Sequence, residues 1–194
     1  MSPRAAIALL LAGVLAACAG AARELVDGWS EVGAGETIVV GRFELVPPLG
    51  KDEQKIQALN SGQFENKIFV IADDNYRTLK GEPTNADFNG RIEATLEKTF
   101  FARSSDRPFY ILGGMVWLEL GSGSSRAYLP GGLRVPLRPG DKAVYIGTVR
   151  YTRDEFFEIK KVAIVDDYER ANSEFRKKFG TKIALRKALL APAK

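Results

Sequence analysis

The side chains that most often do chemistry in proteins are scarce in this chain of 194 residues. It contains no histidine and a single cysteine, Cys18. Histidine is the commonest general base and metal ligand, and one cysteine forms neither an internal disulfide nor a multi-cysteine metal site. The usual hydrolase triads, zinc sites and iron–sulfur centres are therefore excluded. We expect no metal and no cofactor.

Carboxylates are the remaining candidates for catalysis. Two acids about 5–10 Å apart in a cleft would suit glycoside hydrolysis, and the acids we consider are Glu93, Glu97 and Glu119. No spacing singles out a pair, and neither a phosphate loop nor an EF-hand loop is present. We therefore expect a non-catalytic protein. An enzyme acting on glycan or peptide through carboxylates is the alternative.

The N-terminus has the features of a secretory signal peptide. One basic residue, Arg4, precedes an apolar run from Ala5 to Ala17 that ends in small residues. The run is shorter than the roughly 20 residues that cross a bilayer, and small residues suit a cleavage site. We predict a signal peptide over residues 1–17.

The last residues of this segment, Leu15-Ala16-Ala17-Cys18, resemble the lipobox of bacterial lipoproteins. The resemblance implies lipidation of Cys18: a diacylglyceryl group on its sulfur and a further acyl chain, such as palmitate, on its amine. Burial of an acyl chain contributes about 0.8 kcal/mol per methylene, so two or three chains give stable anchoring. Because Ala19 rather than aspartate follows the cysteine, the resemblance favours the outer membrane.

The mature chain divides into three parts. Residues 18–35 are mostly small and polar, so we predict a lipidated cysteine and a flexible tether. Residues 36–167 form the predicted β-domain, and residues 168–194 a basic helical segment. A domain of this size holds a core without disulfides.

The hydrophobic pattern from Thr37 onward has a period of two, which is typical of β-strands. Turn residues separate the runs, and this punctuation favours antiparallel hairpins. We predict a mainly β fold, an antiparallel β-sandwich of about seven strands with a C-terminal amphipathic helix. The predicted strands are 37–46, 66–72, 91–101, 109–120, 133–137, 142–153 and 156–166.

Three details refine this prediction. Residues 91–101 also fit a helical stripe, although strand is preferred, and residues 51–59 suit a helix of two turns. The apolar face of 156–166 changes sides at Lys160-Lys161, so we predict a bulge or strand break there.

The segment Leu133 to Tyr151, with Pro139-Gly140 leading into Tyr145-Ile146-Gly147, resembles envelope lipoproteins with immunoglobulin- or transthyretin-like sandwiches.

Aromatic doublets suggest an apolar outer face on one sheet. They are Phe100-Phe101, Phe109-Tyr110 and Phe156-Phe157. Neighbours in a strand point to opposite faces, so each doublet places one ring outside the core. We expect the C-terminal helix to cover this face; a face that binds a partner or glycan is the alternative.

The C-terminal segment has a helical period from Tyr168 to Phe179, with Gly180 as a stop. From Arg170 to Lys194 it carries eight basic residues and one acid. The basic face could contact anionic headgroups or a partner, or remain solvated. The candidate contact residues are Arg176, Lys177, Lys178, Lys182, Arg186 and Lys187.

Together these features predict a lipid-anchored binding or accessory module of a protein complex in the bacterial cell envelope. Its expected partners are the membrane, through the anchor, and other envelope proteins. Nucleic acid is not expected as a partner of an exported protein. Surface adhesion through outward aromatic residues is a further alternative.

Overall fold

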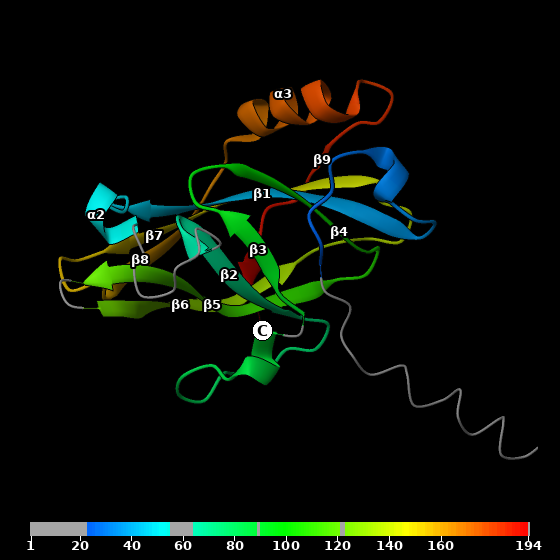
Figure 1. Ribbon diagram of the computed structural model, residues 1–194. Coiled ribbons are helices and arrows are strands. Elements are labelled where there is room, and N and C mark those ends of the chain that lie inside the picture. The colour runs from blue at the N-terminus through cyan, green and yellow to red at the C-terminus, as the bar shows by residue number, and fades with distance from the viewer. Residues whose placement is uncertain (1–22, 55–63, 89, 121–122, 194) are drawn as a thin grey trace, which may run out of the picture.

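The computed structural model describes residues 23–54, 64–88, 90–120 and 123–193 (Figure 1). The predicted signal peptide and Cys18 lie outside these residues, as does most of the predicted helix 51–59, of which only α2 (Lys51–Gln54) is described. The strands are β1 (Glu36–Val46), β2 (Lys67–Asp73), β3 (Ile92–Thr95), β4 (Thr99–Ser105), β5 (Phe109–Leu120), β6 (Gly123–Val135), β7 (Ala143–Arg153), β8 (Ile159–Val165), β9 (Arg186–Lys187) and β10 (Ala191–Pro192).

The predicted mainly β fold is confirmed, because two sheets of five strands make up the body of the protein. Sheet A has the order β4-β1-β7-β8, with β9 also paired to β7, and sheet B has the order β10-β6-β5-β2-β3. The main core contains residues from both sheets. Phe43 of sheet A, for example, stacks on Phe100 at 5.1 Å between ring centroids, and Phe109 of sheet B is fully buried in the same cluster.

Sheet A also contains parallel pairs, which the turn-based prediction of antiparallel hairpins did not include. β1 is parallel to β7, with Ile38 opposite Ala143, and β9 is parallel to β7. The β1–β7 register shifts between Val40 and Gly41, whose partners are Tyr145 and Gly147. Residue 147 has φ of +101°, a conformation that glycine adopts without strain.

The predicted strand 91–101 is wrong as one element. It is two strands, β3 in sheet B and β4 in sheet A, joined by a turn in which Glu97 has φ of +64°. The apolar residues Ile92, Ala94, Leu96 and Phe100 have even spacing in the sequence, so the pattern alone does not indicate the break at Glu97 and Lys98. The doublet prediction holds for Phe100 and Phe101, which belong to the two different apolar clusters.

Two further strand limits differ from the prediction. Of the predicted strand 133–137, residues 133–135 are the end of the longer strand β6, and residues 136–137 lie beyond it. Pro130-Gly131-Gly132 forms a bulge within β6 rather than a turn between strands. Strand β8 begins at Ile159 instead of residue 156, since Phe157 adopts φ of +64° in a preceding turn. The predicted bulge at the lysine pair is confirmed, because Lys161 pairs with Thr152 whereas Ile159 pairs with Arg153.

The predicted helix is confirmed as α3 (Tyr168–Phe179), which ends at Gly180. Its buried residues Ala171, Phe175 and Phe179 pack on sheet A, where Ile38, Val40 and Tyr145 belong to the same cluster. Figure 1 shows α3 lying across the outer side of this sheet. The apolar outer face of sheet A is therefore covered by α3, as expected.

The helical prediction for the rest of 168–194 is wrong. After α3 the chain is extended, and it forms β9 on sheet A and β10 on sheet B. Leu185 and Leu190 are buried in the two different apolar clusters. Strand pairing and the burial of these leucines stabilise an extended conformation more than the helical period of this short segment stabilises a helix.

The predicted tether is packed on the domain from Arg23 onward. Val26 is 2% exposed, and Leu25 forms an isolated antiparallel bridge with Ala102. The indole nitrogen of Trp29, in the short 3-10 helix η1 (Trp29–Glu31), donates a hydrogen bond to the Phe179 carbonyl at 2.9 Å. A few apolar residues in a polar stretch are therefore sufficient to hold this segment on sheet A and α3.

Candidate functional site

The six basic residues predicted as contacts fall into two groups. Three are held by ion pairs within the protein: Lys178 with Asp27 at 2.5 Å, Arg186 with Asp141 at 2.5 Å and Lys187 with Asp166 at 2.8 Å. The other three, Arg176, Lys177 and Lys182, are exposed, and no ion pair joins them to another described residue. Half of the predicted set thus fastens the C-terminal segment to the domain.

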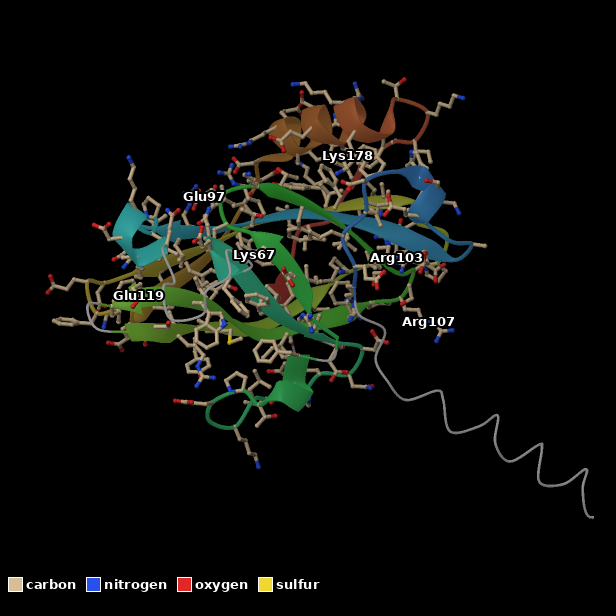
Figure 2. The ribbon with its side chains drawn as sticks, in the orientation of Figure 1. Lys67, Glu97, Arg103, Arg107, Glu119 and Lys178 are labelled. Carbon is tan, nitrogen blue, oxygen red and sulfur yellow. The ribbon has the colours of Figure 1, made fainter. Side chains whose placement is uncertain are left out.

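The three candidate carboxylates lie on different elements. Each contacts a partner of its own: Glu93 with Lys67 at 2.5 Å, Glu97 with Arg42 at 3.2 Å and Glu119 with Ser124 at 3.5 Å. Figure 2 shows Glu97 and Glu119 in separate parts of the molecule. This arrangement does not resemble a pair of acids facing one substrate bond.

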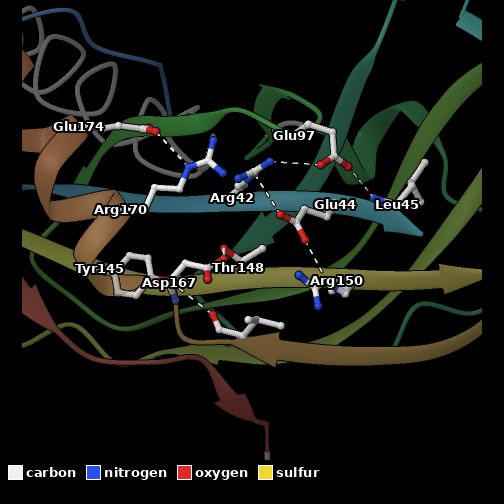
Figure 3. A network of polar contacts seen from close by, with 11 residues as sticks. Arg42, Glu44, Leu45, Glu97, Tyr145, Thr148, Arg150, Asp167, Arg170 and Glu174 are labelled. Atoms are coloured by element: carbon white, nitrogen blue, oxygen red, sulfur yellow. Dashed lines mark hydrogen bonds and ion pairs between the residues drawn. The ribbon is translucent and has the colours of Figure 1, made fainter. Parts of the chain in front are cut away.

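An ionic cluster on sheet A joins neighbouring strands beside α3 (Figure 3). The Glu44 carboxylate is 9% exposed; it lies 3.1 Å from Arg42 Nε and 2.9 Å from Arg150 Nε. Arg42 also contacts Glu97, whose other oxygen accepts a hydrogen bond from the Leu45 backbone at 3.2 Å. Buried charges need such partners, and these contacts link β1, β7 and the β3–β4 turn.

The outer face of sheet B carries a row of aromatic side chains. Phe64 lies 5.7 Å from both Phe69 and Trp117, measured between ring centroids. The Arg126 guanidinium lies over Trp117 at 5.4 Å and over Tyr128 at 5.8 Å. None of these residues belongs to the two apolar clusters. Phe69 is 7% exposed, and the loop after β2, with its short 3-10 helix η4 (Asn85–Phe88), covers part of this face (Figure 1). Among the described residues, no α-helix lies across it as α3 lies across sheet A.

A groove of about 550 Å³ continues this face at the bulge of β6. It lies between the loop after β2, the β5–β6 pair and the start of β8; its lining residues are 76–79, 81, 83, 112, 114, 128–132, 158 and 159. We call it the aromatic groove, after Tyr76 and Tyr128. Figure 1 shows the loop after β2 projecting from the outer side of sheet B.

Glycines allow close packing at the groove. A Cβ at residue 131 would lie 2.2 Å from the Leu112 carbonyl carbon, and one at residue 113 would lie 3.0 Å from Leu79 Cδ1. Larger residues would therefore push the bulge and the loop apart. The ring of Tyr76, which is 42% exposed, lies 5.5 Å from that of Tyr110.

The polar groups around the groove hold its shape. The Tyr128 hydroxyl donates a hydrogen bond to Glu82 at 3.0 Å; burial and this bond raise the pKa of Tyr128. Asp87 accepts from the Thr84 backbone at 2.7 Å and lies 2.7 Å from Arg77; these contacts lower the pKa of Asp87. The loop is thus fixed by its own contacts, and the groove offers mainly apolar and aromatic surface.

Sequence reasoning missed this groove. The signal is present in the alternation of Met115, Trp117 and Glu119 on β5, and of Arg126 and Tyr128 on β6, which are cross-strand neighbours. This alternation can be recognised only when the full length of β6 is known. Pro130-Gly131-Gly132 is typical of a turn, so the sequence predicts a strand that begins after these residues rather than before them.

The described residues contain no helix with the length and apolar character needed to cross a bilayer. They also contain no cluster of three or more acidic or cysteine side chains suited to a metal ion. Comparison of the chain with protein-family models, curated proteins and solved structures gave no match.

Proposed function

We propose that this protein is a lipid-anchored binding module of the bacterial cell envelope, attached through Cys18, which holds an extended segment of a partner protein in the aromatic groove. The observation that carries the proposal is the contrast between the two outer faces. Sheet A is covered by α3, whereas on sheet B the described residues leave Tyr76 exposed and Trp117 and Tyr128 half-exposed. Tyr, Trp and Arg are the residues enriched at binding hot spots.

The edge position of β6 supports a polypeptide as the occupant. Along one side β6 pairs with β5, but on the other the described strands include only β10, opposite Leu133 and Arg134. Edge strands recruit extended segments through backbone hydrogen bonds, while neighbouring pockets select side chains. The groove borders this edge, since residues 128–132 line it.

The separation of the candidate carboxylates supports a binding role over the enzymatic alternative. Glu93, Glu97 and Glu119 each engage a different partner on a different element. Of the acids, Glu158 lines the aromatic groove, and Glu82 accepts a hydrogen bond from the Tyr128 hydroxyl beside it.

Site-specific photo-cross-linking in the producing cell tests the groove. A photoreactive residue replaces Tyr128, and a control replaces Lys177, which is exposed on α3 over the opposite sheet. We expect one protease-sensitive adduct at position 128 only, and its loss with Tyr76→Ala. An adduct sensitive to glycosidase instead, an adduct common to both positions, or no adduct at position 128 would refute the proposal.

Fractionation of cells expressing Cys18→Ser tests the anchor separately. We expect loss of fatty-acid labelling and release of the protein from the membrane fraction, whereas the unsubstituted protein sediments with outer membranes. A labelled, membrane-bound Cys18→Ser protein would show that the lipobox assignment is wrong.

A further inference from the structure

Arg23 fixes the N-terminal segment to one end of the sandwich. Its side chain is 6% exposed, pairs with Asp74 and donates to the Gly90 carbonyl at 3.4 Å. The guanidinium also lies 4.0 Å from the centre of the Phe109 ring. This end is formed by the start of β5 and the end of β2, because Asp73 is opposite Tyr110.

The position of Arg23 limits the distance between this end and the proposed anchor. Only five residue steps separate Cys18 from Arg23. A fully extended chain spans at most about 3.6 Å per residue, so Cys18 lies within about 18 Å of Arg23. A protein anchored at Cys18 must therefore present this end to the membrane.

The same end carries basic side chains without partners. Arg91 follows Gly90, Arg107 precedes Phe109 by two residues, and Lys142 directly precedes the first residue of β7. All three are exposed, and among the described residues no side-chain ion pair or hydrogen bond involves them. Figure 2 shows Arg107 at the end opposite Glu119. We call Arg91, Arg107 and Lys142 the basic end.

The acids at this end contact other groups. Glu36, which is opposite Ser105, accepts a hydrogen bond from the Gly33 backbone at 2.6 Å. Asp74 pairs with Arg23, and Asp141 pairs with Arg186. Asp106 accepts a hydrogen bond from the Gly140 backbone at 3.0 Å, which also joins the loop before β5 to the loop before β7. Among the described residues, none of these acids forms an ion pair with the three basic side chains, which leaves them available to an external anion.

We infer that the basic end docks on anionic phospholipid headgroups and fixes the orientation of the sandwich on its membrane. The inference rests on the proposed anchor at Cys18, which brings this end to the bilayer. Each basic residue close to an anionic surface strengthens binding by about fivefold. Three such residues together account for an effect of about a hundredfold at low ionic strength.

Vesicle co-sedimentation tests this inference independently of lipidation. The chain from residue 18 onward, carrying Cys18→Ser, is mixed with vesicles of phosphatidylcholine alone or of phosphatidylcholine and phosphatidylglycerol. We expect binding only to the anionic vesicles, and a loss of at least about tenfold in Arg91→Gln/Arg107→Gln/Lys142→Gln.

A matched variant removes three charges from the opposite end: Lys51→Gln/Lys98→Gln/Lys161→Gln. These lysines are also exposed and lack side-chain partners among the described residues, and we expect the variant to bind as the unsubstituted chain does. Circular dichroism checks that both variants fold. Equal losses in both variants, or no binding to anionic vesicles, would overturn the inference. Failure of the anchor would instead appear in the Cys18→Ser fractionation.

Discussion

Phe175→Ala tests the packing of α3 on sheet A. Phe175 is fully buried, and its ring lies 6.2 Å from Trp29 and 5.1 Å from Phe179. A buried phenylalanine removes about 150–250 Å² from water, which at about 25 cal/mol per Å² corresponds to about 4–6 kcal/mol. Alanine retains part of this burial, so we expect the free energy of unfolding to fall by about 3–5 kcal/mol.

Urea unfolding followed by circular dichroism measures this change, and Arg176→Ala is the control. The exposed neighbour should change stability by no more than about 0.5 kcal/mol. For a domain of this size the expected loss lowers Tm by about 6–20 °C. A loss below about 1 kcal/mol with an unchanged m-value would show that α3 contributes little to the stability of the domain, and would contradict the covering role described above.

Two further changes test the C-terminal strand and the groove. The hydrogen bond from Arg186 lowers the pKa of Asp141, so its stabilising effect is complete above the ordinary value of 3.8 and is lost as the pH falls through the lowered pKa. Asp141→Asn should therefore cost about 1–3 kcal/mol in urea unfolding near neutral pH, and the difference from the unsubstituted protein should shrink below about pH 4; a constant difference would contradict the ion-pair assignment. Gly131→Ala should destabilise the protein by about 1–3 kcal/mol because its Cβ meets the backbone of Leu112, whereas Gly123→Ala, in the same strand with open space around it, serves as the control; equal stabilities would show that the bulge yields without cost.

Features with a local cause are the ones that the sequence predicts well. The stripe of Ala171, Phe175 and Phe179 before Gly180 has a helical period, and it forms α3 as expected. The change of apolar face at Lys160-Lys161 is likewise local, and the bulge lies there. In both cases the residues that determine the structure are within a few positions of one another.

Features that depend on distant partners are not predictable in the same way. Glu36–Val46 pairs in parallel with a strand about one hundred residues later. The hydrophobic pattern of each strand gives no indication of which strand it pairs with or in which direction. Residues 183–192 have a weak helical period, but they lie beside the edges of two strands. Pairing with these strands makes the segment extended rather than helical. The aromatic groove belongs to this group, because a loop, a bulge and two sheets must come together to form it.

The C-terminal extension joins the two sheets to each other. Residues 186–187 complete one sheet, residues 191–192 complete the other, and the Ala193 backbone donates to the Gly132 carbonyl at 2.8 Å. One short segment therefore pairs with both layers of the sandwich. Any separation of the two layers would have to break these backbone contacts as well as the apolar core between the sheets.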